Sequence, residues 1–464
     1  MSGTLSSLNT ALSALRFNRV AMDVASNNIA NATTEGFTRR RVQGEAVGAP
    51  VQPALWSRYD GTAGGVATGP MERMADSFLD TRARREHGNQ SYLDVRSTVL
   101  QRVEAGIGEP GDNGVAAALA DFRSAWQDLA NNPGGAAARN QVVARANTLV
   151  DAVRIQATNV ATEQGDQRSR LQTLVTDVNT TAGELAATNK SIAAAQFDGS
   201  DRSLLLDQRD QLAMRLAELT GGVATTRPDG GLDVTVQGVS LVSGQTAGQL
   251  EIATGVTPSG GADGNPVTFR VVSGATTTAV PTGVRGEVGA VTDLLTTTLP
   301  AYAAGLGAVA STIADQLNAQ HLLGYDLAGN PGQAFFTYDP ADPAGTLAVA
   351  ITDPAEVAAS ALPGGVLDGT NADRLGQFSD AEDAYQRLVN GFGTEVASVK
   401  RLSATQQLMT GQVDGSREQL SGVNLDEETV AMLSAQRTYE AAARVMTVMD
   451  SVLDTLINRT GLLR

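Results

Sequence analysis

The chain has 464 residues, a formal net charge of −16, no cysteine and only two histidines. These counts exclude a disulfide framework, a thiolate nucleophile and a cysteine-ligated metal, and they argue against nucleic acid or an anionic membrane surface as a partner. Aromatic residues make up only 4% of the chain, and alanine supplies much of the 42% hydrophobic content. This balance favours long helices and narrow interfaces over one large globular core.

The N-terminal segment is predicted to be an amphipathic helix, because its apolar residues recur with heptad spacing. The a and d positions hold Leu5, Leu8, Leu12, Leu15, Met22 and Ile29, with Arg19 and Ser26 as exceptions. One interpretation is a helix face buried in an ordinary core, which is the commoner case for an arbitrary protein. A lone helix at a chain end is marginal in water, however, so we expect this stripe to be an assembly seam that packs against the helix at the other end of the chain, against neighbouring subunits, or both. The segment has neither the basic start nor the continuous apolar run of a secretory signal, and we expect no stretch of the chain to span a bilayer.

A basic run follows, and then a series of helices. Arg39, Arg40 and Arg41 are interpreted as a solvated loop rather than a binding patch. Helices rich in Ala, Leu, Val, Arg and Gln are predicted over residues 76–107, 114–131 and 136–219, with breaks at Gly-Glu-Pro-Gly and Asn-Asn-Pro-Gly-Gly. We expect these helices to pack together as a bundle.

The composition changes after this bundle. Leu232, Val234 and Val236 alternate with polar residues, and Val267, Phe269 and Val271 repeat the pattern, which predicts strands. We expect a β insertion with its own core, one that could be deleted if its two ends lie close together. Helix is predicted to resume near residues 291–323, followed by a turn-rich segment and a final helical region from about residue 379.

The last helix carries a second heptad stripe. Its positions hold Leu425, Met432, Tyr439, Met446 and Leu453, together with Ala435, Ala442, Met449 and Leu456, and Glu428 departs from the pattern. Asn424 followed by Glu427 three residues later has the spacing of a capping box, which predicts the start of this helix.

These elements predict a mainly α fold with a β insertion (α+β) in an elongated, multidomain subunit. Residues 1–40 and 421–464 would form a terminal domain of paired coiled-coil helices. Residues 41–221 and 290–420 would form a helical bundle domain, with a small β and turn-rich segment at about 325–375. Residues 222–289 would form the inserted outer β domain.

Nothing in the sequence has the pattern of a catalytic, cofactor or metal site. His87 and His321 are the only histidines, which leaves little material for a metal site or a Ser-His-Asp triad. Asp207 and Asp210 flank Arg209 and are interpreted as local ion pairing. We therefore predict a protein that is not an enzyme and has no cofactor.

The segment 26–37, Ser-Asn-Asn-Ile-Ala-Asn-Ala-Thr-Thr-Glu-Gly-Phe, resembles the N-terminal signature of the flagellar rod, hook and hook-associated proteins. Polar residues beyond a helix can satisfy its last carbonyls, and Gly36 permits a sharp turn. The residues that carry this motif are Asn27, Asn28, Asn31, Thr34, Gly36, Phe37 and, at the other end of the chain, Asn424. Segments near residues 204–210, 299–336 and 422–439 narrow the resemblance to the hook-associated proteins of the hook–filament junction.

The resemblance implies an axial subunit that assembles with copies of itself, with hook protein on one side and with the second junction protein on the filament side. It also implies type III export, a cytoplasmic chaperone before export and a final extracellular location in the flagellum. Neither nucleic acid nor membrane insertion is expected. A rod, hook or second junction protein is the alternative within the family, and a secreted hydrolase is a distant alternative outside it.

Overall fold

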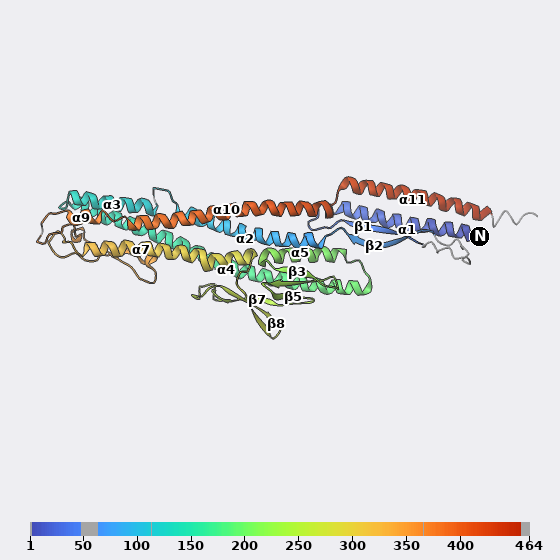
Figure 1. Ribbon diagram of the computed structural model, residues 1–464, viewed down its shortest axis with the longest axis horizontal. Coiled ribbons are helices and arrows are strands. Elements are labelled where there is room, and N and C mark those ends of the chain that lie inside the picture. The colour runs from blue at the N-terminus through green and yellow to red at the C-terminus, as the bar shows by residue number, and fades with distance from the viewer. Residues whose placement is uncertain (1, 48–63, 113, 365, 456–464) are drawn as a thin grey trace, which may run out of the picture.

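The computed structural model describes residues 2–47, 64–112, 114–364 and 366–455, and its side chains from Ser7 onward. The molecule is a long rod (Figure 1). Helices α1 (Ser2–Ala30) and α11 (Leu425–Asp454) lie side by side at one end, where α1 begins and α11 ends. This arrangement confirms the predicted fold class, a mainly helical chain with paired terminal helices and small β-sheets.

A two-stranded ribbon covers part of the terminal helix pair. Strands β1 (Arg40–Ala46) and β2 (Val66–Arg73) are antiparallel, and the ribbon packs on α1. Ser13 Oγ accepts a hydrogen bond of 3.1 Å from the Val66 amide. The prediction that residues 41–73 belong to the helical bundle is corrected here. The strands are mostly exposed and lack a clear apolar alternation, so their sequence does not indicate a ribbon.

The body of the rod is a bundle of long helices. These are α2 (Ser77–Ile107), α3 (Val115–Asn131), α4 (Ala136–Asp198), α5 (Ser203–Thr220) and α10 (Asp380–Ser421). The prediction of one helix over residues 136–219 is wrong. Gly199 ends α4 in the left-handed region at φ 73°, and the Asp201 carboxylate then accepts the Ser203 amide, so the chain turns back as a hairpin.

A continuous helical stretch runs from α6 (Gly286–Asp293) through the π-helical turn η1 (Leu294–Thr298) into α7 (Leu299–His321). It starts five residues before the predicted residue 291. By length and composition alone this stretch could cross a membrane, contrary to the expectation from sequence. Its apolar side chains, such as Leu306 and Val309, are instead buried in the bundle core.

The β insertion forms two small antiparallel sheets beside α4 and α5 (Figure 1). The first contains β3 (Val223–Thr226), β4 (Leu232–Val236), β5 (Val239–Ser243) and β6 (Thr246–Ala247), and the second contains β7 (Gln249–Thr254), β8 (Thr268–Ser273) and β9 (Thr276–Val280). The predicted alternation is confirmed, since Leu232, Val234 and Val236 are all buried. They share one core with Leu174 and Leu185 of α4, so the expectation of an independent β core is wrong.

The turn-rich segment closes the far end of the rod. It contains β10 (Phe336–Thr337), α8 (Pro343–Thr346), β11 (Ala348–Val349), η2 (Pro354–Glu356) and α9 (Thr370–Leu375). His321, at the end of α7, is fully buried and links this segment to α7 through hydrogen bonds. Its Nδ1 lies 2.6 Å from the Gln333 carbonyl, and its Nε2 accepts the Ala358 amide at 2.8 Å.

Candidate assembly site

The inner seam, which we define as the contact face between α1 and α11, includes most of the apolar residues predicted from sequence. On α1, Leu8, Leu12, Leu15, Met22 and Ile29 are partly buried. On α11, Met432, Tyr439, Met446, Met449 and Leu453 are partly buried, and Ala435 and Ala442 are buried. Leu5 and Leu456 lie outside the residues whose side chains are described.

The second heptad position of α1 is one residue earlier than predicted. The buried residues at this position are Ala11, Asn18 and Ala25, whereas Leu12 is only partly buried and Arg19 and Ser26 are exposed. Small side chains at this position let two helices approach closely. The assignment from sequence favoured the larger apolar residue, Leu12, and so missed the alanines. Leu425 is also a correction, because it lies in the first turn of α11 and is 51% exposed.

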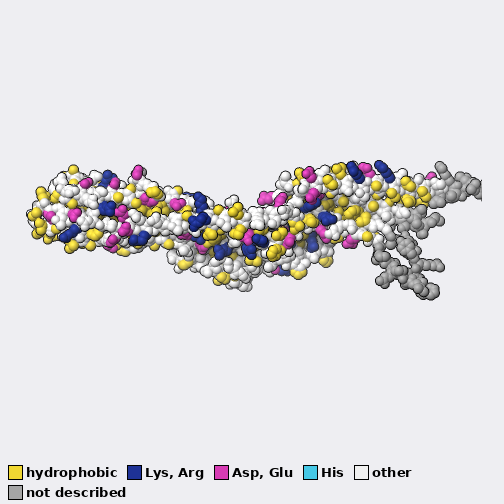
Figure 2. Space-filling model, turned by 45° about the horizontal axis from the view of Figure 1, so that its top comes forward, with side chains coloured by type: hydrophobic (Ala, Val, Ile, Leu, Met, Phe, Trp, Pro, Cys, Tyr) yellow, Lys and Arg dark blue, Asp and Glu magenta, His cyan; other side chains and the backbone are white. Residues whose placement is uncertain are grey.

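A second apolar stripe on α11 faces away from the inner seam. We call it the outer stripe, and its members are Val430, Leu433, Val445, Val448 and Val452. They are between 39% and 67% exposed. Figure 2 shows hydrophobic side chains gathered over this end of the rod. The outer stripe was not predicted from sequence, because a single heptad frame describes one apolar face and a helix that packs on two sides carries two.

A polar joint ties the end of α1 to the start of α11. Asn28 is fully buried, and its Nδ2 donates to the Arg40 carbonyl at 2.8 Å and to Glu428 Oε2 at 3.0 Å. Its Oδ1 accepts the Arg40 amide at 3.1 Å. Arg39 Nε donates to the other oxygen of Glu428 at 2.7 Å. Glu428, the exception in the predicted stripe, is therefore the buried acceptor that closes this joint.

A second group of ion pairs attaches the ribbon to the bundle. Arg73 lies 2.7 Å from Asp207 and 3.0 Å from Asp210, and Arg40 lies 3.3 Å from Asp207. All four side chains are at most 14% exposed. The interpretation of the arginine run 39–41 as a solvated loop is thus wrong for two of its members. Arg209 does pair locally with Asp210, as predicted, but the flanking aspartates also hold distant arginines.

Four other motif residues shape the turn that follows α1. Asn31 Nδ2 donates to the Asn27 carbonyl at 2.9 Å, and Thr34 Oγ1 donates to Asn31 Oδ1 at 3.2 Å. Gly36 has φ 75°, and a Cβ at this position would overlap the side chain of Gln211. Gln211 donates to the Glu35 carbonyl at 2.6 Å, so the turn rests directly on α5.

Two further motif residues complete the joint. The guanidinium of Arg40 lies 5.1 Å from the centre of the Phe37 ring. Asn424 caps α11, as predicted, by accepting the amides of Asp426 and Glu427. The Glu427 carboxylate pairs with Arg39 at 3.0 Å rather than completing a capping box. The motif therefore builds one structure, the connection between the terminal helices and the rest of the chain.

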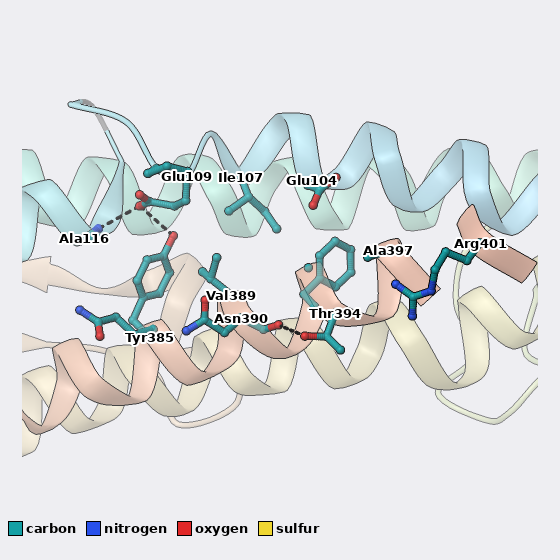
Figure 3. Close-up of a pocket in the computed structure, with 14 residues that line it drawn as sticks. Glu104, Ile107, Glu109, Ala116, Tyr385, Val389, Asn390, Thr394, Ala397 and Arg401 are labelled. Carbon is teal, nitrogen blue, oxygen red and sulfur yellow. Dashed lines mark hydrogen bonds between the residues drawn. The ribbon is translucent and has the colours of Figure 1, made fainter. Parts of the chain in front are cut away.

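A groove of about 690 Å³ lies between α2 and α10 in the bundle (Figure 3). Tyr385 donates to Glu109, which also accepts the Ala116 amide at the start of α3. Burial raises the pKa of the Tyr385 hydroxyl, so it remains a neutral donor. Within the described ranges no group of three His, Asp or Glu residues could hold a metal ion. The groove thus contains capping and packing residues rather than a nucleophile next to a base.

Parts of the chain match known protein families. Residues 8–38 match the flagella basal body rod protein family, and residues 418–459 match the C-terminal region of the flagellar basal body rod FlgEFG proteins. With the paired terminal helices, these matches define the class as an axial protein of the bacterial flagellum. Residues 100–336, more than half of the chain, match the helical domain of the flagellar hook-associated protein FlgK. The chain belongs to the FlgK family of hook–filament junction proteins, which are structural proteins and not enzymes.

Relatives and a solved structure agree with this assignment. The flagellar hook-associated protein 1 of Bacillus subtilis (strain 168) is 28% identical, with 99% of each chain covered. The protein of the same description from Escherichia coli (strain K12) is 24% identical, with 97% of this chain and 99% of the relative covered. The flagellar hook junction protein FlgK from Burkholderia pseudomallei has a similar fold, with a TM-score of 0.65 at 18% identity, over 74% of this chain and all of the other.

Proposed function

We propose that this chain assembles into the axial structure through its terminal helices and that two faces of α11 make different contacts. The inner seam pairs α11 with α1 inside one subunit, and the outer stripe contacts neighbouring subunits. The observation that carries this proposal is the outer stripe itself, because within the described part of the chain five large aliphatic side chains on one helix remain 39% to 67% exposed. Exposed apolar surfaces of this kind commonly mark protein–protein contacts.

The free energies are compatible with assembly that requires several neighbours. Each large aliphatic side chain contributes roughly 1.5 to 3 kcal/mol when it is fully buried. The outer-stripe residues are already partly covered, so each has less than this to gain. Association also costs several kcal/mol in lost rotational and translational freedom. We infer that one contact along α11 is weak and that a subunit surrounded by neighbours is held firmly.

The proposed partners are copies of this chain, hook protein on one side and the second junction protein on the filament side. Before export, the same outer stripe is the surface that a cytoplasmic chaperone would cover, because an uncovered apolar helix would otherwise associate non-specifically. In this proposal the chain leaves the cell through the flagellar type III apparatus and functions outside it, and it binds neither nucleic acid nor a bilayer.

The test is Val448→Asp on the outer stripe, with Thr438→Asp on the same helix as the control. Both positions are exposed, so the fold of the isolated chain should tolerate either carboxylate. Val448→Asp should abolish incorporation at the hook tip, because burying an unpaired carboxylate costs several kcal/mol. Electron microscopy of complemented deletion cells, with secreted protein measured separately, reads out the result. Normal filaments with Val448→Asp would refute the outer stripe as a contact surface.

A further inference from the structure

Three helices meet at His87. This residue is on α2, and its Nε2 lies 3.0 Å from both carboxylate oxygens of Asp414 on α10. Its Nδ1 lies 3.6 Å from Oε1 of Glu218 on α5. The His87 and Glu218 side chains are about one quarter exposed, and Asp414 is 41% exposed. Each ring nitrogen of one imidazole therefore faces a carboxylate from a different helix.

These helices are the ones that connect the terminal domain to the bundle. Helix α2 begins four residues after the ribbon strand β2 ends, with Asp76 as its cap. Helix α5 carries Asp207 and Asp210, which hold the ribbon arginines. Helix α10 continues into α11 after a short break at residues 422–424. A contact that clamps α2, α5 and α10 together therefore acts at the base of the terminal helix pair.

The chemistry of imidazole makes this contact sensitive to protonation. A neutral imidazole has one N–H, so it can donate to only one of the two carboxylates and presents a lone pair to the other. The imidazolium donates from both nitrogens and also carries a positive charge. Only the protonated form donates to both Glu218 and Asp414.

Other charged groups surround this contact, and the cleft of about 620 Å³ beside it carries many of them. On α5, Arg215 lies 3.3 Å from Glu218 and also pairs with Glu287 of α6. On α10, Arg417 pairs with Asp80 of α2 at 3.0 Å and lies 4.0 Å from Asp414. The other charged groups that line the cleft are Glu35, Arg73, Asp207, Asp210 and Glu418. Acidic groups outnumber basic ones there, which favours a proton on His87.

We propose that His87 is a proton-dependent clasp: its protonated ring holds α2, α5 and α10 together at the base of the terminal helices, and its neutral ring loosens their contact. The Glu218 carboxylate, followed by Asp414, raises the pKa of His87 in spite of its partial burial. The clasp is consequently closed below the ordinary histidine pKa of about 6.5 and opens as the pH rises through the raised value. This is a property of the single subunit and holds whether or not the assembly proposal is correct.

The absence of cysteine from the chain allows a direct test. Gln436 on α11 and Glu184 on α4 are both exposed, so cysteines placed there can carry one spin label each. Pulsed electron spin resonance on the full-length double-cysteine protein then gives the spread of distances between the terminal domain and the bundle. In the parent this spread should be narrow at about pH 5 and broad at about pH 9, on either side of the ordinary histidine pKa.

Variants of His87 test whether this residue causes the change in the distance distribution. His87→Gln should give the broad distribution at both pH values, and His87→Arg, which is always charged, should give the narrow one at both. A parent distribution that does not change with pH, or a change that survives in His87→Gln, would overturn the proposal. If circular dichroism shows that His87→Gln does not fold, Asp414→Asn serves instead. It keeps the ring but removes one carboxylate, so it should lose the narrowing at about pH 5, and retention of the narrowing would count against the clasp.

Discussion

Asn28 Nδ2 and Glu428 Oε2 lie 3.0 Å apart although 400 positions separate the two residues in the chain. Both side chains are buried, with relative exposures of 0% and 4%. A buried amide and carboxylate require partners because unpaired polar groups are costly. This contact therefore fixes how α1 and α11 align along one another, in addition to the apolar inner seam.

The first prediction concerns this contact. Asn28→Ala removes bonds to Glu428 and to both backbone groups of Arg40, which should destabilise the terminal pair by about 1 to 3 kcal/mol. Hydrogen exchange of the α1 and α11 amides should become faster, while the α2 and α4 amides keep their protection. Asn27→Ala is the matched control, since Asn27 is exposed. Equal effects of the two variants would mean that the buried amide has no special role.

The second prediction concerns the attachment of the ribbon to the bundle. Asp207→Asn leaves Arg40 without its carboxylate and Arg73 with only Asp210, at a cost of roughly 1 to 3 kcal/mol in the free energy of unfolding. Glu251→Gln removes the exposed pair with Arg270 and should cost less than about 1 kcal/mol. Urea denaturation measures both variants. A control that costs as much as Asp207→Asn would contradict the importance of the buried pairs.

The third prediction concerns the β insertion. The N–H of Arg285 donates to the Thr220 carbonyl at 3.3 Å, so the two ends of the insertion are adjacent and can be rejoined. Deletion of residues 222–284 should nevertheless lower the thermal unfolding temperature and increase binding of a hydrophobic dye, because it would uncover Leu174 and Leu185 of α4. A deletion variant that unfolds at the parent temperature without binding the dye would show that the shared core is dispensable.

The fourth prediction concerns His321. Burial lowers the pKa of His321 to about 4. Between about pH 6.5 and that value the unfolded chain binds a proton that the folded chain does not, so the free energy of unfolding should fall as the pH decreases. The total loss is on the order of 3 kcal/mol, at about 1.4 kcal/mol for each pH unit.

Chemical denaturation across this pH range gives the slope. His321→Gln should be less stable overall but should lose this part of the pH dependence, because the variant has no group there to titrate. The contribution of His87 has the opposite sign and a different window, since its raised pKa places the change above about pH 6.5. His87→Gln should therefore leave the slope below that pH unchanged, and a changed slope would contradict the separation of the two histidines.

Much of the local structure can be predicted from the amino-acid sequence. The alanine-rich composition and the heptad stripes at both ends were sufficient to predict the fold class. The cap at Asn424 and the positive φ at Gly36 were also predictable, since both follow from local chemistry within a few residues. The motif at residues 26–37 pointed to the family that the comparisons established.

The pairing of distant charges depends on the folded chain and cannot be predicted from the sequence. No local pattern connects Arg40, Arg73 and Asp207. Glu428 is an exception in the predicted apolar stripe, and the stripe does not indicate its role as a buried acceptor. Leu12 was assigned to the heptad stripe because it is large and apolar. Close packing of two helices favours the small side chain of Ala11 at this position. The core that α4 shares with the β insertion also could not be predicted from the sequence. Periodicity shows which face of an element is apolar, but the partner of that face is set by the path of the whole chain.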